Sequence, residues 1–124
     1  MAVGVPFSFD AYATLATTLC SGGAEAEWRA AINRAYYPVY HACSAHAVAN
    51  GHLPPPRNSK HAAVWRWFDR STTPPVKAIA VSFHDLMMQR ILADYAASGS
   101  MTAALAAQCA TKAARLLAAI AALP

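Results

Sequence analysis

The sequence has little charge and lacks the residues that several classes of protein require. Only 13% of its 124 residues are charged, and just two are glutamates, Glu25 and Glu27. A di-iron site in a helical bundle needs several inward carboxylates and Glu-x-x-His pairs, so the sequence excludes that class. It also has no glycine-rich phosphate loop, serine elbow or dinucleotide-binding fingerprint. We therefore expect neither a metal nor a cofactor.

Cysteine is also scarce. The three cysteines, Cys20, Cys43 and Cys109, are odd in number and have no Cys-x-x-Cys spacing. This pattern is typical of reduced core residues in a cytoplasmic protein. The first residues have no basic region and no apolar run of signal length, so we do not expect secretion.

The apolar stretch 101–123 is long enough to raise the question of a membrane. Gln108, Lys112 and Arg115 fall on one side of a helix there, and the large apolar residues fall on the other. The sequence therefore predicts an amphipathic packing helix and no membrane contact.

Alanine dominates the sequence and indicates the fold class. It raises the apolar fraction to 56%, and runs of β-branched residues are rare. The chain is expected to form one all-α domain over residues 1–124. Capping residues and breaks in the apolar pattern predict helices at about 10–19, 24–50, 60–69, 74–98 and 102–123. Leu15 is expected to face inward from the first helix, and Ser59 and Thr102 to cap the third and the fifth. The predicted architecture is an up-and-down four-helix bundle with an additional short helix.

One stretch carries the candidate chemistry. Within residues 28–47, WRAAINRAYYPVYHACSAHA, Arg34 and His41 are seven positions apart, so both project from one stripe of a helix. Pro38 cannot donate a hydrogen bond to the carbonyl of Arg34, and we expect a kink there. The opposite face is predicted to be core and comprises Trp28, Ile32, Ala35, Tyr36, Val39, Tyr40, Cys43 and Ala47.

This stretch resembles the HEPN domain, a small helical family found in prokaryotic toxins, defence proteins and RNA-processing enzymes. Residues 89–95, QRILADY, are similar to an R-x-x-A-D-Y run in one branch of that family. Its ribonuclease members carry an R-x(4 to 6)-H motif, pair so that two motifs share a cleft, and cut RNA without metal. Arg34, six residues and His41 match the longest permitted spacing.

The resemblance implies roles that fit the chemistry of the two side chains. Histidine titrates near neutrality and can move a proton, whereas the forked donors of arginine fit phosphate oxygens. We expect His41 and Arg34 to be catalytic, with Asn33 and Tyr37 as supporting residues. The alternative is a surface histidine and an arginine paired to a carboxylate.

Basic residues gather between the second and fourth predicted helices. Arg57, Lys60, Arg66 and Arg70 alternate with aromatic residues there, which could track a phosphate backbone and stack bases. The alternative is a short helix with its aromatic residues packed inward and its arginines solvated. The net charge of +4 is compatible with a polyanionic partner.

The resemblance, together with the basic balance, implies a metal-independent, homodimeric endoribonuclease. Attack by the substrate's own 2′-hydroxyl would leave a 2′,3′-cyclic phosphate. The resemblance further implies a toxin or phage-defence effector, restrained by an antitoxin or nucleotidyltransferase partner. The alternative is a non-catalytic HEPN module that binds a nucleotidyltransferase or another protein. Low surface charge and Pro38 favour the module, and the intact Arg34 and His41 favour the enzyme.

Overall fold

Helices make up all the regular secondary structure in the part of the chain that the computed structural model describes, residues 7–56, 59–97 and 99–124. The protein is therefore all-α, as its composition predicts. The helices are α1 (Asp10–Cys20), α2 (Glu25–Ala49), α3 (Lys60–Asp69), α4 (Pro74–Tyr95) and α5 (Ala103–Ala121). Their bounds agree with the predicted ones to within one or two residues, except that α4 ends about three residues early.

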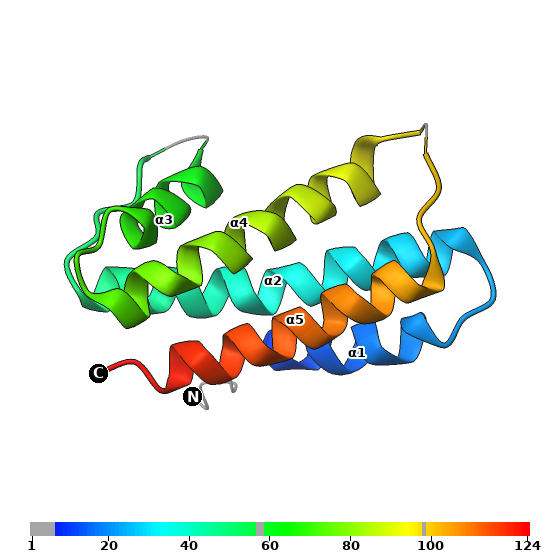
Figure 1. The fold of residues 1–124 in the computed structure, drawn as a ribbon, viewed down its shortest axis with the longest axis horizontal. Helices are drawn as coiled ribbons and strands as arrows, with labels where there is room; N and C mark the ends of the chain where they lie inside the picture. Colours follow the sequence, from blue (N-terminus) through cyan, green and yellow to red (C-terminus); the bar gives the residue numbers. More distant parts are fainter. Residues whose placement is uncertain (1–6, 57–58, 98) are drawn as a thin grey trace, which may run out of the picture.

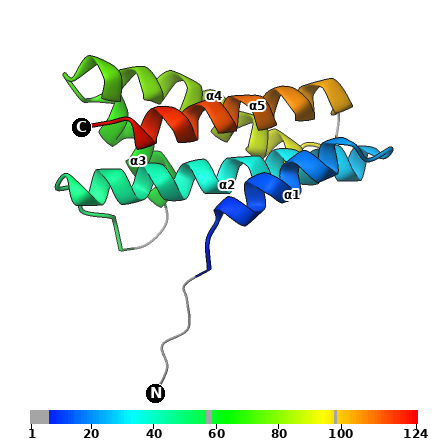
Figure 2. The same cartoon turned by 90° about the horizontal axis from the view of Figure 1, so that it is seen from below.

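Helix α2 lies at the centre of the arrangement and contacts each of the other four helices. In Figure 1, α4 and α5 run on either side of α2, and α3 lies where α2 ends and α4 begins. Figure 2 shows α1 beside the first half of α2. Residues on α2 can therefore contact side chains of α1, α3 and α4.

The core face predicted for α2 is largely confirmed. Six of its eight residues are buried, and Trp28 and Tyr40 are partly buried. The buried residues recur every three or four positions, which is the spacing of one helical face. The largest side chains that are fully buried include Tyr36, Phe68 and Phe83, from three different helices. Helix α2 is not interrupted at Pro38, which is itself buried.

Some local predictions are wrong. Ser59 does not cap α3 through its side chain, because its backbone is left-handed with φ of 72°. Leu15, predicted to face inward, is 40% exposed, and only Ala16 of α1 is fully buried. Thr102 does cap α5, since its hydroxyl accepts a hydrogen bond from the backbone nitrogen of Leu105 at 3.0 Å.

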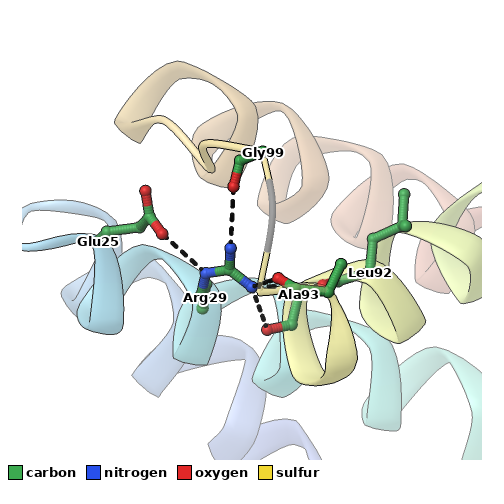
Figure 3. Close-up of polar contacts among 6 residues, drawn as sticks. Glu25, Arg29, Leu92, Ala93 and Gly99 are labelled. Atoms are coloured by element: carbon green, nitrogen blue, oxygen red, sulfur yellow. Dashed lines mark hydrogen bonds and ion pairs between the residues drawn. The ribbon is translucent and has the colours of Figure 1, made fainter.

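Arg29 of α2 fixes the end of α4, a role that the sequence does not reveal. Its guanidinium donates to the carbonyls of Ala93 and Ala96 at 3.1 and 2.7 Å and to that of Gly99 at 3.1 Å (Figure 3). Glu25, one turn earlier, accepts from Nε at 3.0 Å. A cation at the carbonyl end of a helix satisfies unpaired acceptors and complements the helix dipole. This contact holds the end of α4 against α2.

Helix α5 packs by one face. By length and composition alone it could cross a membrane. Its buried residues, Ala106, Cys109, Ala113, Leu116 and Ile120, recur every three or four positions toward the other helices. Lys112 forms an ion pair with Asp85 of α4. The buried stripe is the amphipathic packing that the sequence predicts for this helix.

Candidate active site

Arg34 and His41 both face the first turn of α1. The ring of Phe9 stacks on the imidazole of His41, with the ring centroids 3.6 Å apart and an interplanar angle of 16°. The guanidinium carbon of Arg34 lies 4.7 Å from the centroid of Tyr12. Phe9, the N-cap of α1, and Tyr12 are three positions apart, so the N-terminal end of α1 meets both motif residues. The expected common stripe on α2 is thus present.

The surroundings of these two residues leave them chemically available. Both are only partly buried. Among the described residues, no carboxylate lies within ion-pair distance of Arg34, so the carboxylate pairing considered as its alternative role is not seen there. Burial lowers the pKa of His41 below its ordinary value, which favours the neutral imidazole at neutral pH. A neutral imidazole can accept a proton.

A second histidine, His61 of α3, lies in the same region. Its Nδ1 is 2.5 Å from the hydroxyl oxygen of Tyr36, and its ring stacks on Tyr40 with centroids 3.8 Å apart. The ring of Tyr40 is also 5.2 Å from that of His41. Tyr40 therefore contacts both imidazoles.

Arg90 of α4 completes the polar cluster. Its side chain is 11% exposed, and its guanidinium carbon lies 5.0 Å from the ring of Tyr36 and 5.7 Å from that of Tyr37. Asp94 is 3.5 Å from one terminal nitrogen, and Nε is buried with no hydrogen-bond partner in the described part of the chain. Burial raises the pKa of Tyr36 well above its usual range, with Arg90 opposing the rise, so the hydroxyl stays protonated.

The two supporting residues occupy different positions. Asn33 donates from its amide to both carboxylate oxygens of Asp94, at 2.9 and 3.2 Å, and so links α2 to the Arg90 ion pair. Tyr37 is partly buried, with its ring centroid 6.4 Å from that of His41 and 6.1 Å from that of His61. Tyr37 therefore lies close to both histidines, whereas Asn33 contacts the Asp94 carboxylate that pairs with Arg90.

The predicted RNA-binding residues lie on and near α3, the helix that also carries His61. Lys60, Arg66 and Arg70 are exposed, and Arg57 lies outside the described residues. Arg66 and Arg70 line a hollow of about 470 Å³ whose other polar walls are His52, Ser71 and Thr72. The hollow thus offers several hydrogen-bond donors to an anion.

The aromatic residues of the same segment pack inward, as their alternative role implies. Phe68 is fully buried, and the indole nitrogen of Trp65 donates to the carbonyl of Ala80 on α4 at 3.1 Å. These contacts join α3 to α4, and they leave the exposed basic residues as the part of the segment that an RNA strand could meet.

Sequence reasoning missed the contributions of His61 and Arg90. Both contact Tyr36, but they are 25 and 54 positions away from it in the chain. Helical periodicity links residues three or four positions apart and gives no signal for such contacts. The i, i+4 spacing of Arg90 and Asp94 fits the ion pair between them, whereas spacing says nothing of the approach of Arg90 to the tyrosines.

Among the described residues, no three histidine, cysteine or acidic side chains gather into a group that could hold a metal ion. A hollow of about 1020 Å³ between α4 and α5 is lined by neither Arg34 nor His41.

Comparison of the chain with models of protein families, with curated proteins and with solved structures finds no match.

Proposed function

We propose that the protein is a metal-independent endoribonuclease of the HEPN type. Its five helices would then form an up-and-down four-helix bundle, with α3 as the additional short helix. One observation carries the proposal: Arg34 and His41, spaced as in an R-x6-H motif, face the same turn of α1 and stay partly exposed. The cluster of histidine, tyrosine and arginine beside them provides further groups that suit phosphoryl chemistry.

The reaction follows from the chemistry of these side chains. The 2′-hydroxyl of RNA attacks the adjacent phosphorus, so an O2′–P bond forms and the P–O5′ bond breaks. The products are a 2′,3′-cyclic phosphate and a free 5′-hydroxyl. Arg34 binds the non-bridging oxygens and stabilises their developing charge, and His41 transfers one of the two protons that must move.

The proposal includes a path for the RNA. The strand runs from His41 toward the exposed residues Lys60, Arg66 and Arg70, where phosphates meet basic side chains. This direction keeps the strand near the side of α2 on which α3 lies.

A homodimer is the proposed working form, with two copies paired through their motif faces. Large apolar residues remain exposed elsewhere, including Leu92 and Tyr95 at the end of α4, and an antitoxin or nucleotidyltransferase is the kind of partner that would restrain such an enzyme. The proposed setting is a toxin or phage-defence effector in the cytoplasm.

The nucleophile offers a sharp test of the mechanism. We expect a short RNA to be cut in the presence of EDTA and to yield fragments that end in 2′,3′-cyclic phosphate. The same RNA with a 2′-O-methyl group at each mapped cleavage position should resist cutting there, because the attacking hydroxyl is blocked. Cutting of the methylated RNA at the same positions would contradict this mechanism.

A non-catalytic binding module is the second candidate, and the packing of α1 favours it. Phe9 and Tyr12 cover one face of each motif residue, as they would if the motif merely held α1 against α2. Under this alternative the wild-type protein does not cut RNA. Substitution of Arg34 or His41 would then lower the free energy of unfolding and change no enzymatic activity.

A further inference from the structure

A hollow of about 470 Å³ lies where three segments of the chain meet. The loop after α2 contributes His52, the C-terminal part of α3 contributes Arg66 and Arg70, and the turn into α4 contributes Ser71 and Thr72. Pockets for small molecules commonly measure about 300–1,000 Å³. The hollow therefore has room for a ligand larger than a single ion.

The hollow is positively charged. Arg66 and Arg70 are both exposed and four positions apart, a spacing that brings two side chains to one side of a helix. No acidic side chain is among the described residues that line the hollow. Asp69, which lies between the two arginines in the chain, pairs with Lys77 at 3.9 Å instead. Two forked guanidiniums thus face one space with no carboxylate to neutralise them.

Neutral donors surround the same space. The Ser71 hydroxyl accepts from the backbone nitrogen of Thr73 at 3.1 Å, so its own hydrogen can point to a ligand. The backbone nitrogen of His52 donates to the carbonyl of Ala47 at 2.9 Å, which holds the loop over α3. Nε2 of His52 is buried and has no hydrogen-bond partner in the described part of the chain. Such a nitrogen is costly, and a rotation of the ring toward a bound anion would satisfy it.

Trp67 adds an aromatic wall to the hollow. Its ring is partly buried and is held edge-on by Phe68 and His46, at centroid distances of 5.1 and 5.8 Å. An aromatic ring can stack on any nucleic-acid base. The hollow therefore combines a stacking surface with a set of anion-binding donors, and a nucleotide presents a partner for each.

We propose that this hollow binds a nucleotide through its phosphate monoester, carried by the end of an RNA strand or by a free mononucleotide. Arg66 and Arg70 hold the phosphate, and the base stacks on Trp67. A phosphate monoester carries a charge of about −1.5 to −2 at pH 7, whereas an internal phosphate of a strand carries one negative charge. Two guanidiniums therefore match a terminal phosphate better than an internal one. Because binding here needs no cleavage, the site does not depend on ribonuclease activity.

Titration with adenosine 5′-monophosphate (AMP), followed by NMR, tests the site. AMP should bind and shift the indole resonance of Trp67 and the ring resonances of His52, and adenosine should bind at least about tenfold more weakly. Arg66→Gln and Arg70→Gln should each weaken AMP binding by about 10- to 100-fold, because each removes charge-assisted hydrogen bonds. Arg115→Gln is the matched control, since this exposed arginine lines the other hollow, between α4 and α5. It should bind AMP as the wild type does.

Trp67→Leu separates the base from the phosphate. It should weaken AMP binding by about tenfold, because stacking is lost, and leave the affinity for inorganic phosphate unchanged. Arg66 and Arg70 are exposed, so their variants keep the fold and decide the outcome even if Trp67→Leu does not fold. The inference is wrong if AMP and adenosine bind alike, or if both arginine variants bind AMP with the wild-type affinity.

Three short RNAs of one sequence distinguish the two sources of the phosphate: one with a 5′-phosphate, one with a 3′-phosphate and one with hydroxyls at both ends. Tighter binding of a phosphorylated strand, lost in Arg70→Gln, would identify an RNA end as the ligand. Equal binding of all three, with AMP still bound at the hollow, would identify a free mononucleotide. A protein that binds AMP here but cuts no RNA would keep this inference and overturn the ribonuclease proposal. Cutting without AMP binding would do the reverse.

Discussion

At the scale of single residues, the contact between Phe9 and His41 affects the pKa of that histidine. The two rings are parallel and close, so Phe9 keeps water from one face of the imidazole. Removal of water disfavours the charged form of a histidine, which accounts for the lowered pKa of His41. The same α1 turn places Tyr12 under Arg34. The N-terminal end of α1 therefore shapes the surroundings of Arg34 and His41, although both residues belong to α2.

This account predicts that Phe9→Ala raises the pKa of His41 toward 6.5, the value of an unburied histidine. The shift follows from restored hydration of the imidazole and does not depend on any enzymatic activity. It can be measured by following the His41 ring resonances in an NMR titration. Phe7→Ala is the control, because Phe7 is 59% exposed and contacts Phe9 rather than His41. An unchanged pKa in Phe9→Ala would show that this stacking does not cause the shift.

At the scale of helices, the sequence predicted a good part of what the structure contains. Alanine content and apolar spacing gave five helices and the buried face of α2, and Thr102 marked the start of α5. These features depend on neighbours within a turn or two. Contacts between helices were not predictable, because spacing along the chain carries no signal for them. Three of the contacts described above belong to that class: His61 with Tyr36, Arg90 with the tyrosines, and Arg29 with the end of α4.

Arg29 offers a prediction at this scale. Arg29→Gln removes the charged donors that satisfy the last carbonyls of α4, so the free energy of unfolding should fall by about 2 kcal/mol. Urea denaturation followed by circular dichroism measures this change through the midpoint. Arg115→Gln, on the exposed side of α5, should change it by less than about 0.5 kcal/mol. Equal stability of the two variants would mean that Arg29 does not hold α4.

At the scale of the whole molecule, the distribution of positive charge bears on RNA binding. The net charge of +4 is modest, so RNA binding depends on where the positive side chains lie rather than on their number. Arg66 of α3 and Arg70, the C-cap of that helix, are four positions apart and line one hollow. The proposed strand would cross this hollow after leaving the motif face. Phosphate contacts there would set affinity without setting sequence preference.

The double variant Arg66→Gln, Arg70→Gln tests this path. We expect weaker binding of single-stranded RNA and a plot of log K against log salt that is shallower by about 1.4, because two phosphate contacts are lost. Fluorescence anisotropy over a series of salt concentrations measures both. Arg115→Gln should keep the wild-type slope. A double variant with the wild-type slope would place the RNA elsewhere.

Cleavage of a fluorescent RNA in EDTA by the wild type, Arg34→Ala and His41→Ala tests the central claim most directly. All three proteins should show the same helical circular dichroism, and Arg115→Ala serves as a surface control that keeps full activity. The account predicts cutting by the wild type and a loss of about 100-fold or more in each motif variant. Absence of cutting by the wild type, or equal cutting by all the proteins, would contradict the ribonuclease assignment and favour the binding module.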